Sequence, residues 1–227
     1  MTFRRLIVAI DGPSGAGKST VAKALAKRLG YQYIDTGAMY RAVAWKAKRA
    51  SMDIEDESAL TELASSLHFT FLTEGERIRF FCDHEEITEA IRSPEISRLA
   101  SEISRKKGVR EALVEKQREM GKEGGMVFEG RDIGTVVFPK ADIKFYLHAD
   151  AVERGRRRFK ELLEKGMEVD FEETLKEVIE RDRNDMNREI SPLKKAEEAI
   201  EIDSTHLSIE EVVEEMYRLI LEKIGKE

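Results

Sequence analysis

The chain has 227 residues, 41% of them hydrophobic and 37% charged, and its net charge of −6 argues against a general nucleic-acid or acidic-membrane binder. Its length and apolar content exclude a disordered chain, and no apolar run approaches the ~20 residues of a membrane span. Cys82 is the only cysteine, which excludes an internal disulfide or a cysteine-based zinc site and fits a reducing cytoplasm, where we expect the protein to be located.

A glycine-rich loop near the start of the chain matches the phosphate-binding pattern G-x-x-x-x-G-K-[ST]. A buried strand is predicted at residues 7–10 and a helix at residues 18–29, so the loop has a strand before it and a helix after it, which argues against a chance match. Glycines let backbone N–H groups point at an anion, Lys18 can reach the outer phosphates, and the Ser19 hydroxyl can bind Mg²⁺. The predicted nucleotide-binding residues are Gly12, Pro13, Ser14, Gly15, Ala16, Gly17, Lys18, Ser19 and Thr20.

A second short strand is predicted at residues 32–34, and polar residues follow it directly. Thr36 is the predicted N-cap of an alanine-rich helix that runs to about residue 50. Ligands of open α/β sheets bind where strands end and helices begin, so Asp35 and Arg41 could face the same cleft as the loop. The alternative is a capping aspartate and a surface arginine.

Residues 63–93 have a different pattern, which predicts an insertion in the core. Two alternating runs, at residues 68–72 and 77–81, flank a turn at residues 73–76 and predict a hairpin. A further strand near residues 86–88 would complete a small antiparallel sheet. His68, Cys82 and His84 match no zinc spacing, and we expect a structural role for them.

The second half of the chain alternates short apolar strands with helices. Helices are predicted at residues 94–104 and 109–120, the second closed by Gly124 and Gly125, and strands at residues 126–128, 143–147 and 199–202. The last helix begins at Ser208 with a capping box. Five strands alternating with helices predict an α/β fold with a five-stranded parallel sheet flanked by helices.

Two arginine-rich helical segments lie between the last two strands. On each of them, charged residues recur at helical spacing, and arginine suits bidentate phosphate contacts, so these segments are expected to form a mobile cover. The aligned sets are Arg154, Arg157 and Arg158 on one helix, and Arg181, Asp185 and Arg188 on the other. A solvated face balanced by glutamates is the alternative for both sets, and we adopt it for Arg156, Lys160 and Arg183.

These features together indicate phosphoryl transfer between two nucleotides. One phosphate loop holds one nucleoside triphosphate, and the additional arginines suggest a second phosphate-bearing substrate and a transition state rich in negative charge. Because no histidine, serine or cysteine has the setting of a nucleophile, direct in-line transfer is the simplest interpretation.

The sequence resembles the bacterial cytidylate kinase family of nucleoside monophosphate kinases. The matching stretches are IDGPSGAGKST, YIDTGAMYRAVA, SEISRKKGVREAL, EGRDIGTVVFP, ERDRNDMNREISPL and IDSTHLSIEEVV. The resemblance implies ATP with Mg²⁺ as the donor, CMP or dCMP as the acceptor, and CDP or dCDP plus ADP as products. It also implies a core P-loop domain at residues 1–36, 108–152 and 187–227, a monophosphate-binding domain at 37–107 and a lid region at 153–186.

The same resemblance assigns roles to individual residues. The family often has serine where this chain has Thr36, and some members have glycine where it has Ser19, so a serine–Mg²⁺ bond can form here but is not implied by the family. The implied catalytic residues are Lys18, Arg131, Arg188, Arg157 and Arg158. The implied substrate contacts are Ser101, Arg110 and Asp132 for the pyrimidine, Arg41, Arg131 and Arg188 for the acceptor phosphate, Thr36, Arg181 and Asp185 for the ribose, with Asp35 and Tyr40 in the matching stretch beside them.

The expected preference for cytosine also follows from hydrogen bonding. Asp132 can accept from the cytosine amino group, while Arg110 and Ser101 can donate to the ring nitrogen and carbonyl. Uracil reverses the amino and ring-nitrogen positions, so CMP and dCMP should be preferred to UMP.

Two other functions compete with this prediction. A GTPase-like switch that acts on a protein partner would carry N-K-x-D on a late strand, and the sequence contains no such tetrapeptide. A P-loop kinase for a different acceptor is the second alternative, against which Ser101, Arg110 and Asp132 indicate a nucleotide. Nothing in the sequence demands a partner chain, so we expect a monomer.

Overall fold

The computed structural model describes residues 5–75 and 77–225. The chain divides into two compact units, the first formed by Met1–Tyr31 and Gly125–Glu227 and the second by Gln32–Gly124. The arginine-rich segment at residues 153–186, predicted as a lid, belongs to the first unit. The predicted division into core, monophosphate-binding domain and lid stays a prediction.

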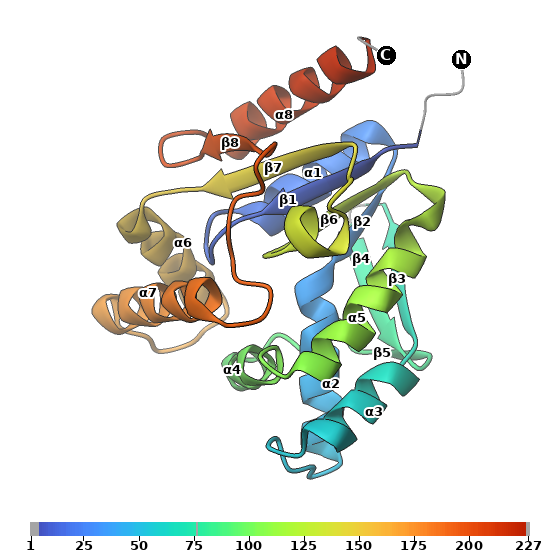
Figure 1. The fold of residues 1–227 in the computed structure, drawn as a ribbon. Coiled ribbons are helices and arrows are strands. Elements are labelled where there is room, and N and C mark those ends of the chain that lie inside the picture. Colours follow the sequence, from blue (N-terminus) through green and yellow to red (C-terminus); the bar gives the residue numbers. More distant parts are fainter. Residues whose placement is uncertain (1–4, 76, 226–227) are drawn as a thin grey trace. The chain divides into compact units, whose positions relative to one another are not determined.

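The main sheet has five strands and confirms the predicted parallel α/β architecture (Figure 1). Its strands are β1 (Ile7–Asp11), β2 (Gln32–Asp35), β6 (Met126–Gly130), β7 (Ile143–His148) and β8 (Ile200–Asp203), in the spatial order β2-β6-β1-β7-β8. Strand β1 pairs in parallel with β6 and β7, and β7 pairs in parallel with β8. Strands β1, β6 and β7 are buried almost throughout, as strands covered on both faces require, whereas only Ile202 of the edge strand β8 is buried.

The register of the central strands brings their carboxyl ends to one edge of the sheet. Asp11, the last residue of β1, lies opposite Gly130 of β6 and Tyr146 of β7. The segments that leave these strands are therefore neighbours, and the phosphate loop is one of them.

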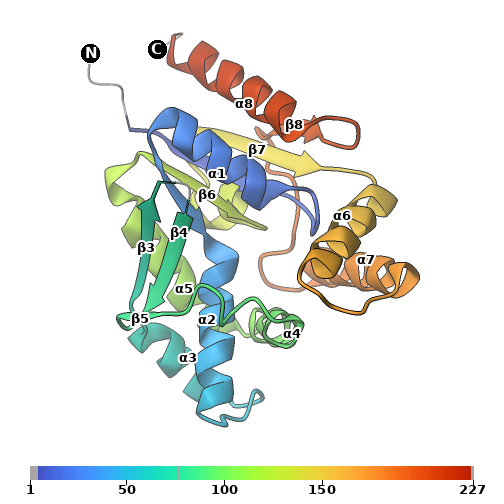
Figure 2. The ribbon, with the colours of Figure 1, turned by 180° about the vertical axis from the view of Figure 1, so that it is seen from behind.

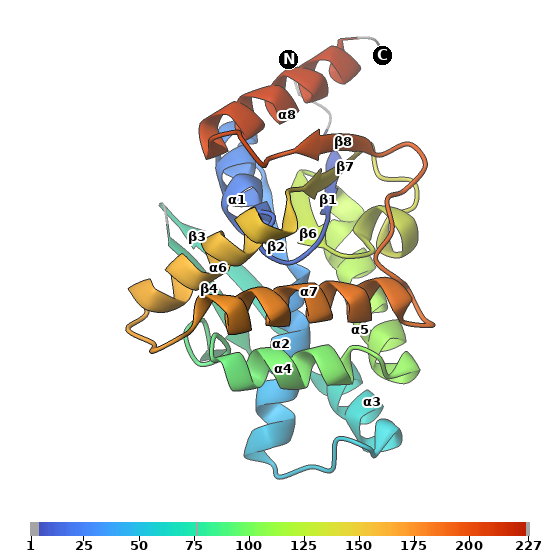
Figure 3. The same cartoon turned by 90° about the vertical axis from the view of Figure 1, so that its left-hand side faces the viewer.

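Helices of the first unit cover both faces of its strands. They are α1 (Lys18–Leu29), α6 (Ala151–Glu164), α7 (Phe171–Asn187) and α8 (Ile209–Ile224), together with a π-helical turn η2 (Ile133–Val137). Helices α1 and α8 pack against each other, and α6 packs along α7. Figures 1 and 3 show α1 and η2 on opposite faces of β1 and β6. The fully buried Ile10, Phe128 and Phe145 form the core between these layers.

The second unit combines helices with a small antiparallel sheet. Its helices are α2 (Thr36–Arg49), α3 (Glu57–Ser66), α4 (Pro94–Ile103), α5 (Lys107–Met120) and the short 3₁₀ helix η1 (Gly121–Glu123). Its sheet contains β3 (Phe69–Glu74), β4 (Arg77–Cys82) and β5 (Glu85–Glu86), paired antiparallel as predicted (Figure 2). Strand β3 extends to Glu74, so it includes the first two residues of the turn predicted at residues 73–76. Glu76, the last residue of that predicted turn, lies outside the described residues.

Two helix ends differ from the sequence prediction. Asp35, not Thr36, is the N-cap of α2: its carboxylate accepts from the Ala38 amide at 2.9 Å, and Thr36 is the first helical residue. Aspartate is as good an N-cap as threonine or better, so the cap moves one residue toward the strand. Helix α5 ends at Met120, as predicted, but its C-cap is Gly121 and not Gly124, because the 3₁₀ helix η1 lies between the two glycines. Gly30, Asp150 and Asp170 cap the helices at residues 18–29, 151–164 and 171–187, and the predicted capping box at Ser208 is confirmed.

Cys82 and its neighbours belong to the small sheet. Cys82 pairs with Glu85 across a turn whose two central residues, Asp83 and His84, have φ values of +48° and +67°. Two left-handed residues in succession define the turn type whose twist suits a hairpin. Burial raises the pKa of the Cys82 thiol to about 12, so Cys82 is a core residue and a poor nucleophile at neutral pH.

No helix in the described part of the chain combines the length and the apolar composition needed to cross a membrane.

Candidate functional site

The phosphate loop connects β1 to α1 and packs tightly on β7. Gly12 has φ +151°, and a Cβ at this position would stand 1.9 Å from the carbonyl oxygen of Leu147. The loop ends at Gly17, the N-cap residue of α1, which has no side chain to satisfy the first amides of the helix. Those amides can donate to an anion, and the helix dipole attracts negative charge to the same point.

Lys18 lies inside the loop rather than in solvent. Its Nζ donates to the carbonyl oxygen of Pro13 at 2.6 Å, and the residue is only 6% exposed. Burial, followed by the charge of Arg131, lowers the pKa of Lys18 to about 7, while Glu129 opposes the change. In the free protein, burial and Arg131 therefore outweigh the carboxylates that act on Lys18, and a bound phosphate anion would favour its charged form.

This pKa predicts proton uptake when a nucleotide binds. At pH 8 Lys18 is mostly neutral in the free protein, and a bound triphosphate restores the charged form, so binding should take up on the order of 0.9 proton. Isothermal titration calorimetry of ATP binding in two buffers with different protonation enthalpies measures this number. Lys18→Arg, whose side chain stays charged at pH 8, is the matched control and should take up none; equal uptake by both proteins would contradict the assignment.

Asp11 links the end of β1 to the π-helical turn η2. Its two carboxylate oxygens accept from the amides of Ile133 at 2.8 Å and Gly134 at 2.7 Å. Burial raises the pKa of Asp11 to about 6 despite these hydrogen bonds. Because η2 begins immediately after Asp132, Asp11 fixes the backbone that carries this predicted pyrimidine contact. From the sequence, Asp11 is only the residue that follows the strand predicted at residues 7–10.

A charged network connects the tip of β6 with the end of α7. Arg131 Nε donates to Asp185 Oδ2 at 2.9 Å, and Arg188 Nη1 lies 3.7 Å from Asp185 Oδ1. Arg188 Nη2 lies 4.0 Å from Asp132 Oδ1, and Arg188 Nε donates to the Ser191 carbonyl at 2.6 Å. Arg188, Asp185 and Asp132 have side chains that are 10% exposed or less. The structure therefore brings four predicted site residues into one buried cluster.

The electrostatics of this cluster centre on Asp185. Burial alone would raise the pKa of its carboxyl group, but Arg131, Arg181 and Arg188 outweigh that effect and lower it. The pKa of Arg131 is raised because Asp185, followed by Asp182 and Glu129, outweighs its own burial. Arg181 lies one helical turn before Asp185 on α7. Arg131, Arg181 and Arg188 thus lie around Asp185, and guanidinium groups are the donors that bind a substrate phosphate with paired hydrogen bonds.

Arg154 contacts the phosphate loop from α6 and is not a surface arginine. It forms a buried ion pair with Asp182 of α7, and its Nη1 donates to the Ser14 carbonyl at 2.9 Å. Asp182 Oδ1 accepts from the Ser14 amide at 2.9 Å. The alternative of a solvated face does not hold for Arg154, because α7 and the loop cover this position. A contact of Arg154 with a substrate phosphate stays a prediction.

Arg157 and Arg158 have different surroundings. Arg157 donates to the Ser204 hydroxyl at 3.1 Å and to the Ser204 carbonyl at 2.6 Å. Ser204, which follows β8, also donates from its hydroxyl to the Ala16 carbonyl of the loop at 3.2 Å. Arg158 forms an ion pair with Glu161 of its own helix. Of these two predicted catalytic arginines, Arg157 is therefore linked to the loop through Ser204.

The second unit carries the other predicted contacts, the first of them at the end of β2. Arg41 Nη2 donates to Asp35 Oδ2 at 2.7 Å across Gly37, where a Cβ would lie 3.1 Å from both side chains. Thr36 is 4% exposed between them. Asp35 is a capping aspartate, as the alternative interpretation has it, and Arg41 pairs with it at the surface of the helix start with 22% of its side chain exposed. That both residues face the cleft of the phosphate loop stays a prediction.

A second cluster of this unit contains Arg110. Its guanidinium carbon lies 5.3 Å from the centre of the Tyr40 ring, and its Nη1 donates to the Ser104 carbonyl at 3.0 Å. The Ser104 hydroxyl in turn donates to the Ser101 carbonyl at 2.8 Å. Arg110 is 2% exposed. A ligand group that contacts it would lose its water, so a ligand that cannot form the hydrogen bond would bind much more weakly than one that can.

The residues that sequence reasoning missed are those that hold the loop: Asp11, Asp182 and Ser204. Asp182 had a usable signal, since it stands one turn before Asp185 on the same helix as the predicted ribose contacts. Ser204 had a weaker one, its position in the matching stretch after the last strand. Asp11 had the same weak signal, its position in the stretch IDGPSGAGKST, but spacing could not reveal its partners Ile133 and Gly134, which are more than 120 residues away in sequence.

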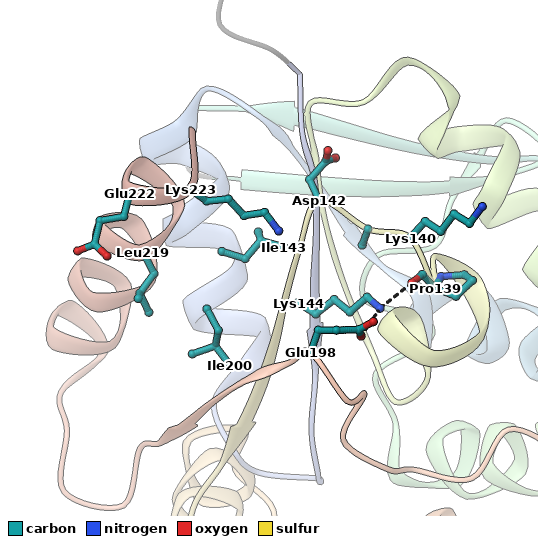
Figure 4. Close-up of a pocket in the computed structure, with 11 residues that line it drawn as sticks. Pro139, Lys140, Asp142, Ile143, Lys144, Glu198, Ile200, Leu219, Glu222 and Lys223 are labelled. Carbon is teal, nitrogen blue, oxygen red and sulfur yellow. Dashed lines mark hydrogen bonds and ion pairs between the residues drawn. The ribbon is translucent and has the colours of Figure 1, made fainter. Parts of the chain in front are cut away.

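A cavity of about 650 Å³ lies at the other edge of the same sheet (Figure 4). Ile143, Ile200 and Leu219 contribute to its lining. Lys144 is held by the Pro139 carbonyl at 2.6 Å and by Glu198 at 3.0 Å. Because Ile143 pairs with Val8 at the start of the parallel strands, this cavity is separate from the phosphate loop at their carboxyl ends.

Comparisons with known proteins find matches over almost the whole chain. The family model described as cytidylate kinase matches residues 8–222. A cytidylate kinase of Geobacter sp. (strain M21) is 53% identical over 221 residues, which cover 97% of this chain and 95% of that protein. A cytidylate kinase of Bacillus subtilis (strain 168) is 44% identical over 220 residues, which cover 97% and 98%.

A solved structure supports the fold alone. An uncharacterized protein from Eubacterium ventriosum ATCC 27560 superimposes with a TM-score of 0.51 at 12% identity, covering 95% of this chain and 98% of that one.

Proposed function

Because the chain belongs to the cytidylate kinase family, we propose that it transfers the γ-phosphoryl group of ATP directly to CMP or dCMP and releases ADP with CDP or dCDP. The observation that carries this proposal is the pairing of two anion sites in the first unit. The phosphate loop around Lys18 is one, and the Arg131–Asp185–Arg188 cluster is the other. Arg131 lies close enough to lower the pKa of Lys18.

The donor triphosphate binds to residues 12–20. Amides of the loop and of the first turn of α1 donate to its phosphate oxygens, and Lys18 neutralises the outer phosphates. Ser19 is exposed in the first turn of α1, and its hydroxyl is the kind of oxygen ligand that Mg²⁺ prefers, so it fits a magnesium ion that arrives with the nucleotide. That ion supplies additional positive charge to the phosphates when bound.

The acceptor is held by three sets of side chains. Arg41, Arg131 and Arg188 hold its phosphate. Thr36, Arg181 and Asp185 contact the ribose, while Ser101, Arg110 and Asp132 contact the pyrimidine, with Asp35 and Tyr40 supporting Arg41 and Arg110. This assignment is supported by the ion pair of Arg41 with Asp35 and by the burial of Arg110 and Asp132.

The chemistry requires orientation and charge stabilisation rather than a nucleophilic side chain. Loose transition states of phosphoryl transfer spread negative charge over the equatorial oxygens, and lysine and arginine stabilise that charge if water is excluded. Lys18 and Arg131 serve this role from the loop and from β6, and Arg157 and Arg158 do so from a lid formed by residues 153–186. The protein works as a monomer in the cytoplasm and needs no nucleic acid or membrane.

A coupled assay tests the proposed function. The protein is offered ATP and Mg²⁺ with CMP, dCMP, UMP, AMP or GMP, each separately, and ADP formation is followed. We expect the highest kcat/KM with CMP or dCMP. A preference for AMP or GMP would contradict the acceptor assignment, and ADP formation with none of the five would contradict the kinase itself.

Asp132→Ala tests the pyrimidine assignment. The carboxylate is proposed to accept from the cytosine amino group, so its removal should reduce the ratio of kcat/KM for CMP to that for UMP by roughly 10- to 100-fold. Glu215→Ala on α8, which removes an exposed carboxylate, is the control and should keep the ratio. An unchanged ratio in a folded Asp132→Ala protein would show that another group recognises the base.

A further inference from the structure

Ser14, at the tip of the phosphate loop, has both backbone groups held by one buried ion pair. Its amide donates to Asp182 Oδ1 at 2.9 Å, and its carbonyl accepts from Arg154 Nη1 at 2.9 Å. The side chains of Arg154 and Asp182 are 9% and 7% exposed, and they form an ion pair with each other. Arg154 Nε also donates to the Ala149 carbonyl at 2.9 Å, just after β7. The pair therefore connects the loop tip to α6, to α7 and to the central sheet.

Close packing restricts movement of the loop tip relative to α6 and α7. A Cβ at Gly15 would lie 2.8 Å from the Arg154 carbonyl oxygen and 3.0 Å from its Cβ. Next to Arg154 on α6, a Cβ at Gly155 would lie 2.8 Å from Leu175 of α7. The loop thus packs closely on α6 at Gly15, and α6 packs closely on α7 at Gly155, so a shift of the loop tip requires the helices to move.

Stability alone is a weak explanation for this pair. The cost of removing both charges from water cancels most of their attraction, and apolar residues of similar volume often stabilise a buried site as well or better. What apolar residues could not do is hold a backbone N–H and a backbone C=O in fixed positions. The geometry of the pair matches that second task.

The same helix serves both halves of the charged site. Asp182 precedes Asp185 by one turn of α7, and Asp185 holds Arg131 and lies near Arg188. The carboxylate of Asp182 also raises the pKa of Lys18 and of Arg131, although other groups act more strongly on both. A helix that fixes the loop tip and the arginine cluster together sets the distance between them.

We propose that Arg154 and Asp182 are positioning residues, which clamp Ser14 to α6 and α7 and thereby hold the phosphate loop in the shape that binds the donor triphosphate. This inference rests on the proposed function for the identity of the donor, ATP. Of the two proposed substrate sites, the clamp forms hydrogen bonds only with the donor loop, at Ser14, so its loss should weaken donor binding far more than acceptor binding.

The decisive variant replaces both members of the pair, Arg154→Met together with Asp182→Leu. It removes two charges at once and leaves no unpaired buried ion, so its urea midpoint should stay at or above that of the wild type. The dissociation constant of Mg-ATP, measured by calorimetry, should rise by roughly 10- to 100-fold, while the KM for CMP changes by less than about twofold. The exposed pair on α8, replaced as Arg218→Ala with Glu215→Ala, is the control and should alter neither constant.

An unchanged ATP affinity in the stable double variant would show that the pair only fills space, and equal losses for ATP and CMP would also overturn the clamp. If the double variant does not fold, Arg154→Lys decides the matter. Lysine keeps the charge opposite Asp182 but lacks the fork that reaches Ser14 and Ala149 together, so ATP affinity should fall several-fold, and an unchanged affinity overturns the proposal. Because calorimetry measures ATP binding alone, a wild type that binds ATP without phosphorylating CMP would refute the proposed function and not the clamp.

Discussion

Replacing Lys18 with alanine is expected to reduce the turnover of ATP with CMP by about 10²- to 10³-fold, because the variant lacks the cation that faces the developing charge on the transferred phosphoryl group. Lys18 is buried, and no other side chain of the loop at residues 12–20 carries a positive charge. Steady-state kinetics at saturating ATP measure the effect. Near-normal turnover would contradict the role assigned to the loop.

Removing the charge of Lys18 should not make the protein less stable than the wild type. The pKa of Lys18 is lowered on folding to about 7, so between pH 7 and about 10.5 the unfolded chain binds more protons than the folded one and stability rises with pH. Below pH 7 the folded protein bears the full cost of a buried ammonium group. Lys18→Met, which keeps the apolar stem, should therefore unfold at an equal or higher urea concentration at pH 7, and a clear loss of stability would argue that Lys18 is structural.

Asp185→Ala is expected to lower the free energy of unfolding by about 3–5 kcal/mol, because it leaves the buried Arg131 and Arg188 without the carboxylate between them. Activity should be lost as well, since the two arginines would repel each other and leave their present positions. Urea unfolding without nucleotide measures the first effect, and the coupled assay with CMP measures the second. Glu215→Ala removes an exposed carboxylate beside Arg218 and should cost less than about 1 kcal/mol.

The pH dependence of stability should also distinguish the wild type from Asp185→Ala. The pKa of Asp185 is lowered on folding, so its contribution is present above the ordinary pKa of an aspartate and is lost as the pH falls through the still lower folded value. The stability difference between wild type and Asp185→Ala should therefore shrink below about pH 4. A difference that stays constant there would indicate a cavity effect instead of lost charge pairing.

Local patterns were sufficient to predict the elements, and they failed where distant segments compete for a side chain. The strand, glycine loop and helix at residues 7–29 could be predicted because each part has its own signal. At the start of α2, Asp35 and Thr36 were both acceptable caps, and the chosen one is the residue that also receives Arg41. Sequence spacing could not choose between them.

The arginines of α6 illustrate a different limit. Helical spacing predicts that Arg154, Arg157 and Arg158 point to similar sides, but it does not say which side another helix will cover. Arg154 is buried by α7 and the loop, Arg157 reaches Ser204, and Arg158 stays with Glu161. Likewise, the π-helical turn at Ile133–Val137 has no local signal. The carboxylate that accepts hydrogen bonds from its first two amides belongs to Asp11, more than 120 residues earlier in the sequence.

A glycine in a phosphate-loop motif can be required by the bound nucleotide or by the fold itself. The contact of Gly12 with β7 shows that the fold requires this one. A methyl group at position 12 would overlap the Leu147 carbonyl oxygen before any nucleotide is present, so this glycine is required by the assembly of the strand and the loop. In a library screened only for accumulation of folded protein, without selection for catalysis, substitutions at Gly12 should already be depleted. Substitutions at Ser19, which is exposed, should survive that screen and be removed only by a screen for activity.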